Sequence, residues 1–214
     1  MRKELKDYIM KNIKEKYKHF DKAHNVQHYN YVTKNCVNYG KKLIEKGENI
    51  DLDIAYIVGA FHDIGIINGR ENHALSSGKI VRVDAELKKY YDNNTIEIIA
   101  EAVEDHSSHL SYEPRNIYGK IVADADRSNS KYLIFSRPIK YRLKNVGCKS
   151  KNEIIDEVYE FVKNKYGRDG YVKYWLNIKE TITEQDNIWN LLDDEESCRR
   201  YIEGLFDEIT KGRF

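Results

Sequence analysis

The sequence predicts an all-α protein, a single-domain helical bundle over residues 1–214. Apolar residues recur at three- and four-residue steps along most of the chain, which is the period of amphipathic helices. The chain has only two prolines, and proline is the residue that most often interrupts a helix. The two-residue alternation typical of strands is weak and is confined to residues 171–175.

The N-terminal helices are predicted from their apolar stripes and caps. The first helix is expected to bury Ile13 and Tyr17, which lie four residues apart. The second begins near Asp21 or Asn25, since both residue types are favoured as N-caps, and it runs to about Gly47.

A third helix is expected to begin after Asp51 and to end at Gly65, because glycine commonly follows a helix C-terminus. Two more helices are expected over 72–81 and 94–103, each opened by an asparagine cap, Asn72 and Asn94. These helices belong to an expected core over residues 20–127.

The later part of the chain is predicted to cover that core. A short helix with a strongly apolar face is expected over 117–125, and another helix over 153–161. Further helices carry Trp175 and Ile188. We therefore expect residues 128–214 to form C-terminal helices that pack on the core.

The charge of the chain is close to neutral but uneven. A formal net charge of +1 disfavours a nucleic-acid partner or a nuclease activity. Residues 127–152 nevertheless contain eight Lys or Arg residues and no acid. Two readings stay open, a solvated helix face with a loop, or an electropositive wall that attracts a phosphorylated substrate and includes Lys131.

The composition indicates a reducing compartment. Three cysteines lie far apart with no CxxC spacing, which is typical of ordinary thiols. The N-terminus is too charged for a secretory signal, and the longest apolar run, 54–61, is far shorter than the roughly 20 residues that cross a bilayer. We expect a cytoplasmic protein with no membrane partner, and an oligomer is compatible with the sequence.

Four inward-facing polar side chains point to a metal site. His28 lies four residues before Val32, at the head of an apolar stripe, so it faces inward. His62 and Asp63 follow the apolar face of the third helix, and Asp126 ends another apolar helix. A buried carboxylate beside a buried imidazole is costly unless it is paired or bound to a metal.

Two imidazoles and two carboxylates make a mixed nitrogen and oxygen donor set. Such a set suits Mn²⁺, Fe²⁺, Co²⁺, Ni²⁺ or Zn²⁺, with Mg²⁺ also compatible, and it lacks the thiolates of structural zinc. We expect one such ion, and two are compatible with the further histidines nearby.

The sequence at these positions resembles the HD-domain metal-dependent phosphohydrolase superfamily, which has the pattern H…HD…D. The matching segments are 20–28 (FDKAHNVQH), 60–65 (AFHDIG) and 123–127 (ADADR). The resemblance implies a helical bundle with the metal at its centre and the metal ligands His28, His62, Asp63 and Asp126.

The resemblance also implies hydrolysis of a phosphate ester or anhydride, with a nucleotide or another small phosphorylated metabolite as substrate. Asp63, His73 and His106 are the candidate catalytic residues. Histidines in this interval of the family bind phosphate, act as a general acid or hold a second metal, and the alternative for His73 and His106 is a structural or exposed histidine. Two other functions stay open, a nucleotide-binding regulatory module without turnover and a dinuclear-iron oxygenase of HD type.

Two more residues are candidates for contact with the substrate. His24 lies one helical turn before His28, and a capping or ligand-supporting role is the alternative for it. Arg127 follows Asp126 directly, and its guanidinium can contact phosphate or pair with Asp124.

Overall fold

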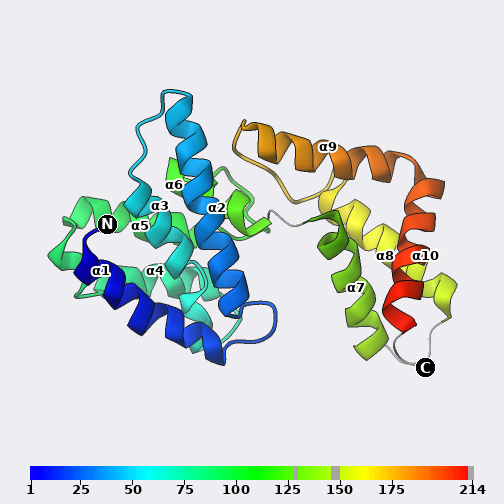
Figure 1. Cartoon of the computed structure of the whole chain (residues 1–214), viewed down its shortest axis with the longest axis horizontal. Helices are drawn as coiled ribbons and strands as arrows, with labels where there is room; N and C mark the ends of the chain where they lie inside the picture. Colours follow the sequence, from blue (N-terminus) through cyan, green and yellow to red (C-terminus); the bar gives the residue numbers. More distant parts are fainter. Residues whose placement is uncertain (128–129, 146–149, 212–214) are drawn as a thin grey trace. The chain divides into compact units, whose positions relative to one another are not determined.

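The computed structural model describes residues 1–127, 130–145 and 150–211, and it contains no strand in that part of the chain (Figure 1). The α-helices are α1 (Lys3–Tyr8), α2 (Val26–Glu45), α3 (Leu52–Phe61), α4 (His73–Val83), α5 (Asn93–Glu104), α6 (Ile117–Arg127), α7 (Lys131–Asn145), α8 (Lys151–Tyr166), α9 (Lys179–Asp193) and α10 (Glu195–Thr210). The all-α prediction is confirmed.

Two expectations for this segment are wrong. Residues 171–175 form no strand, and Trp175 lies between α8 and α9 rather than in a helix. The backbone N–H groups of Trp175 and Leu176 donate to the buried carboxylate of Asp124 on α6, at 2.8–3.0 Å. These backbone N–H groups are therefore satisfied by a buried carboxylate, and not by the carbonyl oxygens of a neighbouring strand.

The chain divides into two compact units. The first comprises Met1–Arg127 and Tyr174–Ile178, and the second comprises Ser128–Lys173 and Lys179–Phe214. Each unit contains its own cluster of buried apolar side chains. The first unit's longer segment ends at Arg127, the residue at which the expected core also ends. The single domain over residues 1–214 stays a prediction.

The N-terminal helical segment continues α1 through a π-helical turn, Ile9–Ile13, and a 3₁₀ segment, Lys14–His19. Ile13 and Tyr17 are buried as expected. Of the two candidate caps for α2, Asn25 is the one used, because its side chain accepts from the backbone N–H groups of the second and third helical residues.

The prediction that the third helix ends at Gly65 is wrong. Helix α3 ends at Phe61, and Gly65 lies inside a 3₁₀ turn, Ile64–Asn68. Close packing, and not a helix end, requires glycine at position 65. A Cβ atom there would lie 2.1 Å from the carbonyl oxygen of His73 and 2.5 Å from the backbone nitrogen of Ser77. The turn therefore lies directly against α4.

Two other helix boundaries differ from the expectation. Helix α5 is capped by Asp92, whose carboxylate accepts from the backbone N–H of Thr95, and Asn94 lies inside the helix. Asn72 precedes α4 as expected, but it adopts a left-handed backbone conformation (φ 55°) and its side chain makes no capping bond.

The second unit is built from α7, α8, α9 and α10 (Figure 1). Phe135 and Ile139 of α7 pack with Val158 of α8 and Ile202 of α10 in its apolar cluster. The basic segment 127–152 therefore contains a well-formed helix with one buried apolar face. In the part of the chain that the structure describes, no helix is long and apolar enough to cross a membrane.

Candidate metal centre

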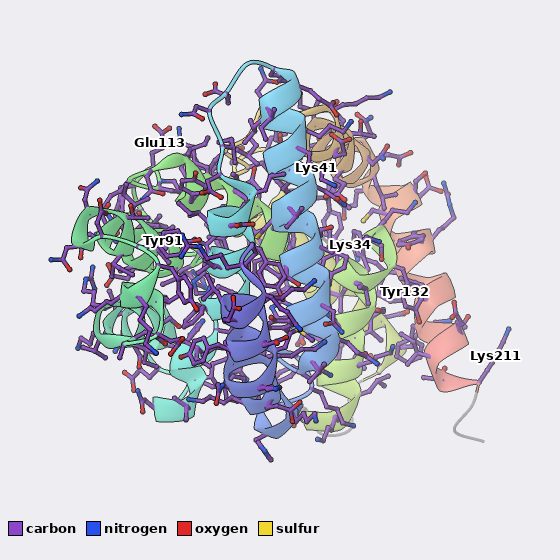
Figure 2. All side chains as sticks on the ribbon, turned by 60° about the vertical axis from the view of Figure 1, so that its left-hand side comes forward. Lys34, Lys41, Tyr91, Glu113, Tyr132 and Lys211 are labelled. Carbon is purple, nitrogen blue, oxygen red and sulfur yellow. The ribbon has the colours of Figure 1, made fainter. Side chains whose placement is uncertain are left out.

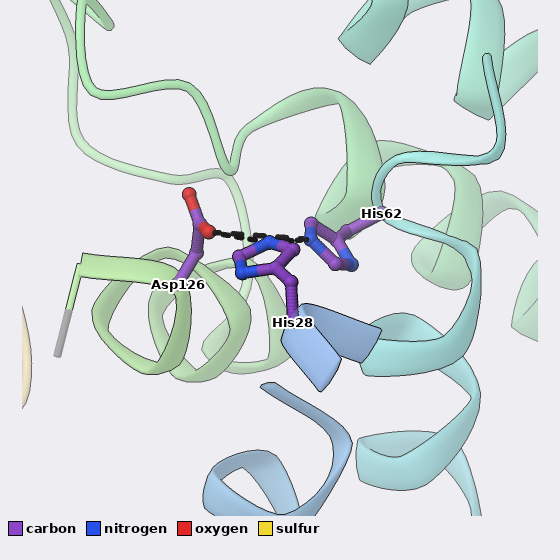
Figure 3. A group of neighbouring side chains, drawn as sticks. All are labelled: His28, His62 and Asp126. Carbon is purple, nitrogen blue, oxygen red and sulfur yellow. Dashed lines mark hydrogen bonds and ion pairs between the residues drawn. The ribbon is translucent and has the colours of Figure 1, made fainter. Parts of the chain in front are cut away.

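The predicted metal ligands lie at the ends of different helices of the first unit and point toward one another. His28 is in the first turn of α2, His62 follows the last residue of α3, and Asp126 is in the last turn of α6 (Figure 3). The sharp end of α3 after Phe61 directs two consecutive side chains, His62 and Asp63, into the same space.

His28, His62 and Asp126 form the first donor group. The Nε2 atoms of His28 and His62 are 3.1 Å apart, and Oδ1 of Asp126 lies 3.1 Å from the former and 4.0 Å from the latter. Oδ2 of Asp63 faces the same two histidines, at 3.3 Å from His28 and 3.1 Å from His62. All four predicted ligands are therefore brought together.

The other oxygen of Asp63 belongs to a second donor group, which it forms with His73 and His106. Oδ1 of Asp63 lies 3.3 Å from Nε2 of His73 and 3.5 Å from Nε2 of His106. One buried carboxylate thus faces a different pair of histidines with each of its oxygens. A carboxylate in this position can bridge two cations.

The tautomers of three histidines follow from their backbone contacts. Nδ1 donates to the carbonyl oxygen three residues earlier in His62 (2.8 Å to Gly59), in His73 (3.0 Å to Arg70) and in His106 (2.6 Å to Val103). A carbonyl oxygen only accepts, so Nδ1 holds the proton and Nε2 presents its lone pair. Metal-binding histidines are commonly oriented by such bonds.

These tautomers make the site fit a cation. The Nε2 atoms of His73 and His106 face each other at 3.3 Å, and two lone pairs at this distance repel unless a proton or a metal ion lies between them. Oδ2 of Asp63 is buried and makes no hydrogen bond within the described part of the chain. An orphaned carboxylate oxygen among imidazole nitrogens is the donor chemistry that a divalent transition metal requires.

The electrostatics of the site also favour bound positive charge. Burial alone would raise the pKa of Asp63, but the surrounding imidazoles, His62 first among them, outweigh this effect and hold the pKa well below its ordinary value. Burial lowers the pKa of His28, and the carboxylates of Asp126 and Asp63 outweigh this effect and raise it to about 9. The two carboxylates therefore favour positive charge at the position of His28.

His24 lies beside both donor groups without belonging to either. Its ring centroid is 5.9 Å from that of His28 and 6.2 Å from that of His73. Its Nδ1 pairs with Oδ1 of Asp21 at 2.9 Å, and Oδ2 of the same carboxylate lies 3.4 Å from the guanidinium of Arg70. The predicted role of His24 in substrate contact stays a prediction.

Arg127 and Lys131 occupy different units. The Arg127 side chain is buried, donates to the carbonyl oxygen of Ser107 at 2.8 Å, and has one guanidinium nitrogen 3.8 Å from Asp124. This is the pairing that the sequence left open as the alternative to phosphate contact. Lys131 belongs to the second unit, where its ammonium lies 4.5 Å from the ring centroid of Tyr201. Substrate contact by either residue stays a prediction.

The sequence analysis missed the polar cluster that directly precedes His106 in the chain. The fully buried carboxylate of Asp105 accepts from the backbone N–H of Arg115 at 2.8 Å, from its guanidinium at 2.9 Å and from the hydroxyl of Tyr112 at 3.0 Å. Arg115 also donates to Glu104 at 2.7 Å. Two acids directly before a histidine at the end of an apolar helix were the available signal.

Comparison with known families agrees with this geometry. The HD domain model matches residues 14–129, which is more than half of the chain and includes every residue of both donor groups. Members of this superfamily are mostly metal-dependent hydrolases. No curated protein and no solved structure matches the chain. The helical fold and the family model together identify the chain as a member of the HD-domain family.

Proposed function

We propose that the protein is a metal-dependent phosphohydrolase that acts on a nucleotide or another small phosphorylated metabolite in the cytoplasm. The observation that carries the proposal is the position of Asp63, whose two oxygens face two different pairs of histidines. Two adjacent cation sites are a recurring arrangement in enzymes that displace groups at phosphorus.

The donor atoms support this chemistry. When bound, divalent ions stabilise the charge that develops on phosphoryl oxygens and lower the pKa of coordinated water. The protein contributes the mixed nitrogen and oxygen donors, and each group leaves positions for a substrate oxygen and for water. Of the donor side chains, Asp63 is buried, whereas Asp126 is 27% exposed and His73 is 28% exposed, so each donor group has at least one side chain that solvent reaches.

The roles of the predicted catalytic residues follow from their places in the two groups. His73 and His106 present unprotonated Nε2 atoms toward Asp63, which favours metal binding over the role of general acid. His24 is then the neighbouring histidine that is left for contact with the substrate. Its pairing with Asp21 holds the ring in one orientation.

The second donor group also supports another function. A dinuclear-iron oxygenase needs ligands beyond the first group, and His73 and His106 are placed to supply them. Such an enzyme would contain two irons per chain and show an absorption band of oxidised iron. A regulatory module would instead bind nucleotides saturably and release no phosphate.

The test measures phosphate release from a panel of nucleoside triphosphates, nucleoside monophosphates and sugar phosphates. Each substrate is offered with Mn²⁺, Co²⁺, Ni²⁺, Mg²⁺ or a chelator, and metal content is measured on the same preparations. We expect metal-dependent turnover that falls by at least about 100-fold in Asp63→Asn and Asp126→Asn, since both remove a charged donor.

His19→Gln is the matched control, because His19 is exposed and lies outside both donor groups. It should leave turnover and metal content unchanged. If Asp63→Asn and Asp126→Asn keep both metal content and activity, the proposed site is wrong. A silent panel together with an iron absorption band would select the oxygenase instead.

A further inference from the structure

Helix α7 exposes a row of cations for which the described part of the chain supplies no ion-pair partner. Arg137, Lys140 and Lys144 are spaced by three and four residues, so they lie on one side of the helix, and all three are exposed. None of them pairs with an acid among the described residues. By contrast, Arg142 on the same helix donates to Glu157 at 3.0 Å.

Two exposed tyrosines flank this row. Tyr132 is 37% exposed and Tyr141 is 62% exposed, and Lys140 lies over the Tyr132 ring with its nitrogen 5.5 Å from the centroid. At 1.5 Å per residue the two tyrosines are about 14 Å apart along the axis, with Arg137 and Lys140 between them and Lys144 one turn beyond Tyr141. Figure 2 labels Tyr132 on this helix.

We propose that this surface, Tyr132, Arg137, Lys140, Tyr141 and Lys144, binds single-stranded nucleic acid. Cations that track the phosphates combined with aromatic rings on which unpaired bases stack are the recurring composition of single-strand binding surfaces. The proposal is independent of the metal site and of the reaction proposed for it. The net charge of +1 for the whole chain led us to expect no nucleic-acid partner. The proposal differs from that expectation because residues 127–152 have a local excess of positive charge.

The composition of the surface favours a single-stranded nucleic acid over a membrane. A helix that lies on a membrane buries a wide apolar face in the lipid. Three large apolar side chains of α7, Ile134, Phe135 and Ile139, are buried in the core of the second unit, and its two leucines, Leu133 and Leu143, are partly buried. Tyrosines are the large apolar side chains that remain exposed on this helix, and their rings suit stacking on bases.

Three phosphate contacts set the expected behaviour. Neutralising three phosphates of a single strand gives a slope of about −2 in a plot of log K against log salt concentration. Binding should therefore be detectable at low salt and should fall by about tenfold or more between 50 and 200 mM salt. Stacking adds a contribution that salt does not remove, since it involves no counterions.

The test uses the full chain in chelator, so that bound metal contributes no phosphate contact. Fluorescence anisotropy is measured with a labelled 12-nucleotide oligo(U), and thermal melting checks the fold of each variant. We expect Arg137→Gln/Lys140→Gln/Lys144→Gln to weaken binding at least tenfold and to flatten the salt dependence. Tyr141→Ala should weaken it about fivefold and keep the salt slope, because it removes stacking alone.

The matched control is Lys11→Gln/Lys34→Gln/Lys41→Gln, which removes the same charge from exposed positions of the first unit. Figure 2 labels Lys34 and Lys41, which lie on α2. The control should bind like the unmodified protein. The proposal is overturned if the two triple variants bind equally, or if anionic phospholipid vesicles bind through α7 while oligo(U) does not.

Discussion

The shared carboxylate of Asp63 allows a sharp test of the site. Asp63→Asn keeps the shape of the side chain but replaces one donor oxygen with an NH₂ group and removes the charge. Each Asp63 oxygen lies within 3.5 Å of the Nε2 atoms of two histidines, so the substitution reaches both donor groups at once. Metal binding should therefore weaken whether the cation is bound in the first donor group or in the second.

The magnitude can be worked out from mass action. A ligand present at about 100 times its Kd stabilises the folded state by about 2.7 kcal/mol. For a chain of this size that corresponds to a rise in Tm of about 5–11 °C. Mutation of groups that only orient a metal ligand weakens binding by about 10–100-fold, so loss of a charged ligand should reach at least the upper figure. The stabilisation then falls to about 0.4 kcal/mol, or a rise of about 1–2 °C.

The assay is thermal unfolding with Mn²⁺ and with chelator, and the difference between the two melting temperatures is the quantity compared. Each variant is its own reference, so any effect of Asp63→Asn on the metal-free protein cancels. Asp7→Asn is the control, because Asp7 is exposed on α1. If Asp63→Asn shows the full shift that the control shows, Asp63 is not a ligand and the reasoning fails.

Two further predictions concern the structure around the site. Gly65→Ala should lower the free energy of unfolding by about 1–3 kcal/mol, because its Cβ would collide with the backbone of α4. Gly204→Ala in α10 is the matched control and should stabilise by about 0.5–1 kcal/mol, since no atom lies within 4 Å of the added methyl group; equal effects in thermal melting would refute the packing argument. Glu104→Gln should reduce the loss of stability in acid. Burial raises the pKa of Glu104, but hydrogen bonds from Arg82 and Arg115 outweigh it and lower the pKa below its ordinary 4.5, so this stabilisation is present above about pH 4.5 and is lost as the pH falls below it. Denaturant unfolding at pH 7 and pH 3.5 measures it, and an unchanged difference in the variant would contradict the assignment.

Much of the metal site could be predicted from the sequence, because its residues carry a local signal. His28, His62 and Asp126 are polar side chains on otherwise apolar helical faces. Burying such groups costs free energy unless they have a partner, so their presence on a core face indicates a shared function. The family pattern H…HD…D then connects segments that are distant along the chain.

Helix boundaries were predicted less well, since the deciding contacts are not local. Gly65 has the composition of a helix end, yet its place is determined by α4, which packs against its backbone. Residues 171–175 have a weak strand pattern, yet their backbone N–H groups find other acceptors. The N–H of Trp175 bonds to Asp124, about 50 residues earlier in the chain, and those of Tyr171 and Val172 bond to carbonyl oxygens of α8. Periodicity cannot report a partner that only folding brings near.

The sequence by itself determined the helical class of this protein and pointed to the residues that gather in its candidate metal centre, because helical periodicity and polar residues on apolar faces are local features of the chain. The tertiary structure decided that Asp63 faces two pairs of histidines, and that the exposed cations of α7 form one row away from its buried face. Both results depend on the direction of side chains in three dimensions. The sequence pattern identifies which residues take part, but only the packing of the helices determines which of their atoms face one another.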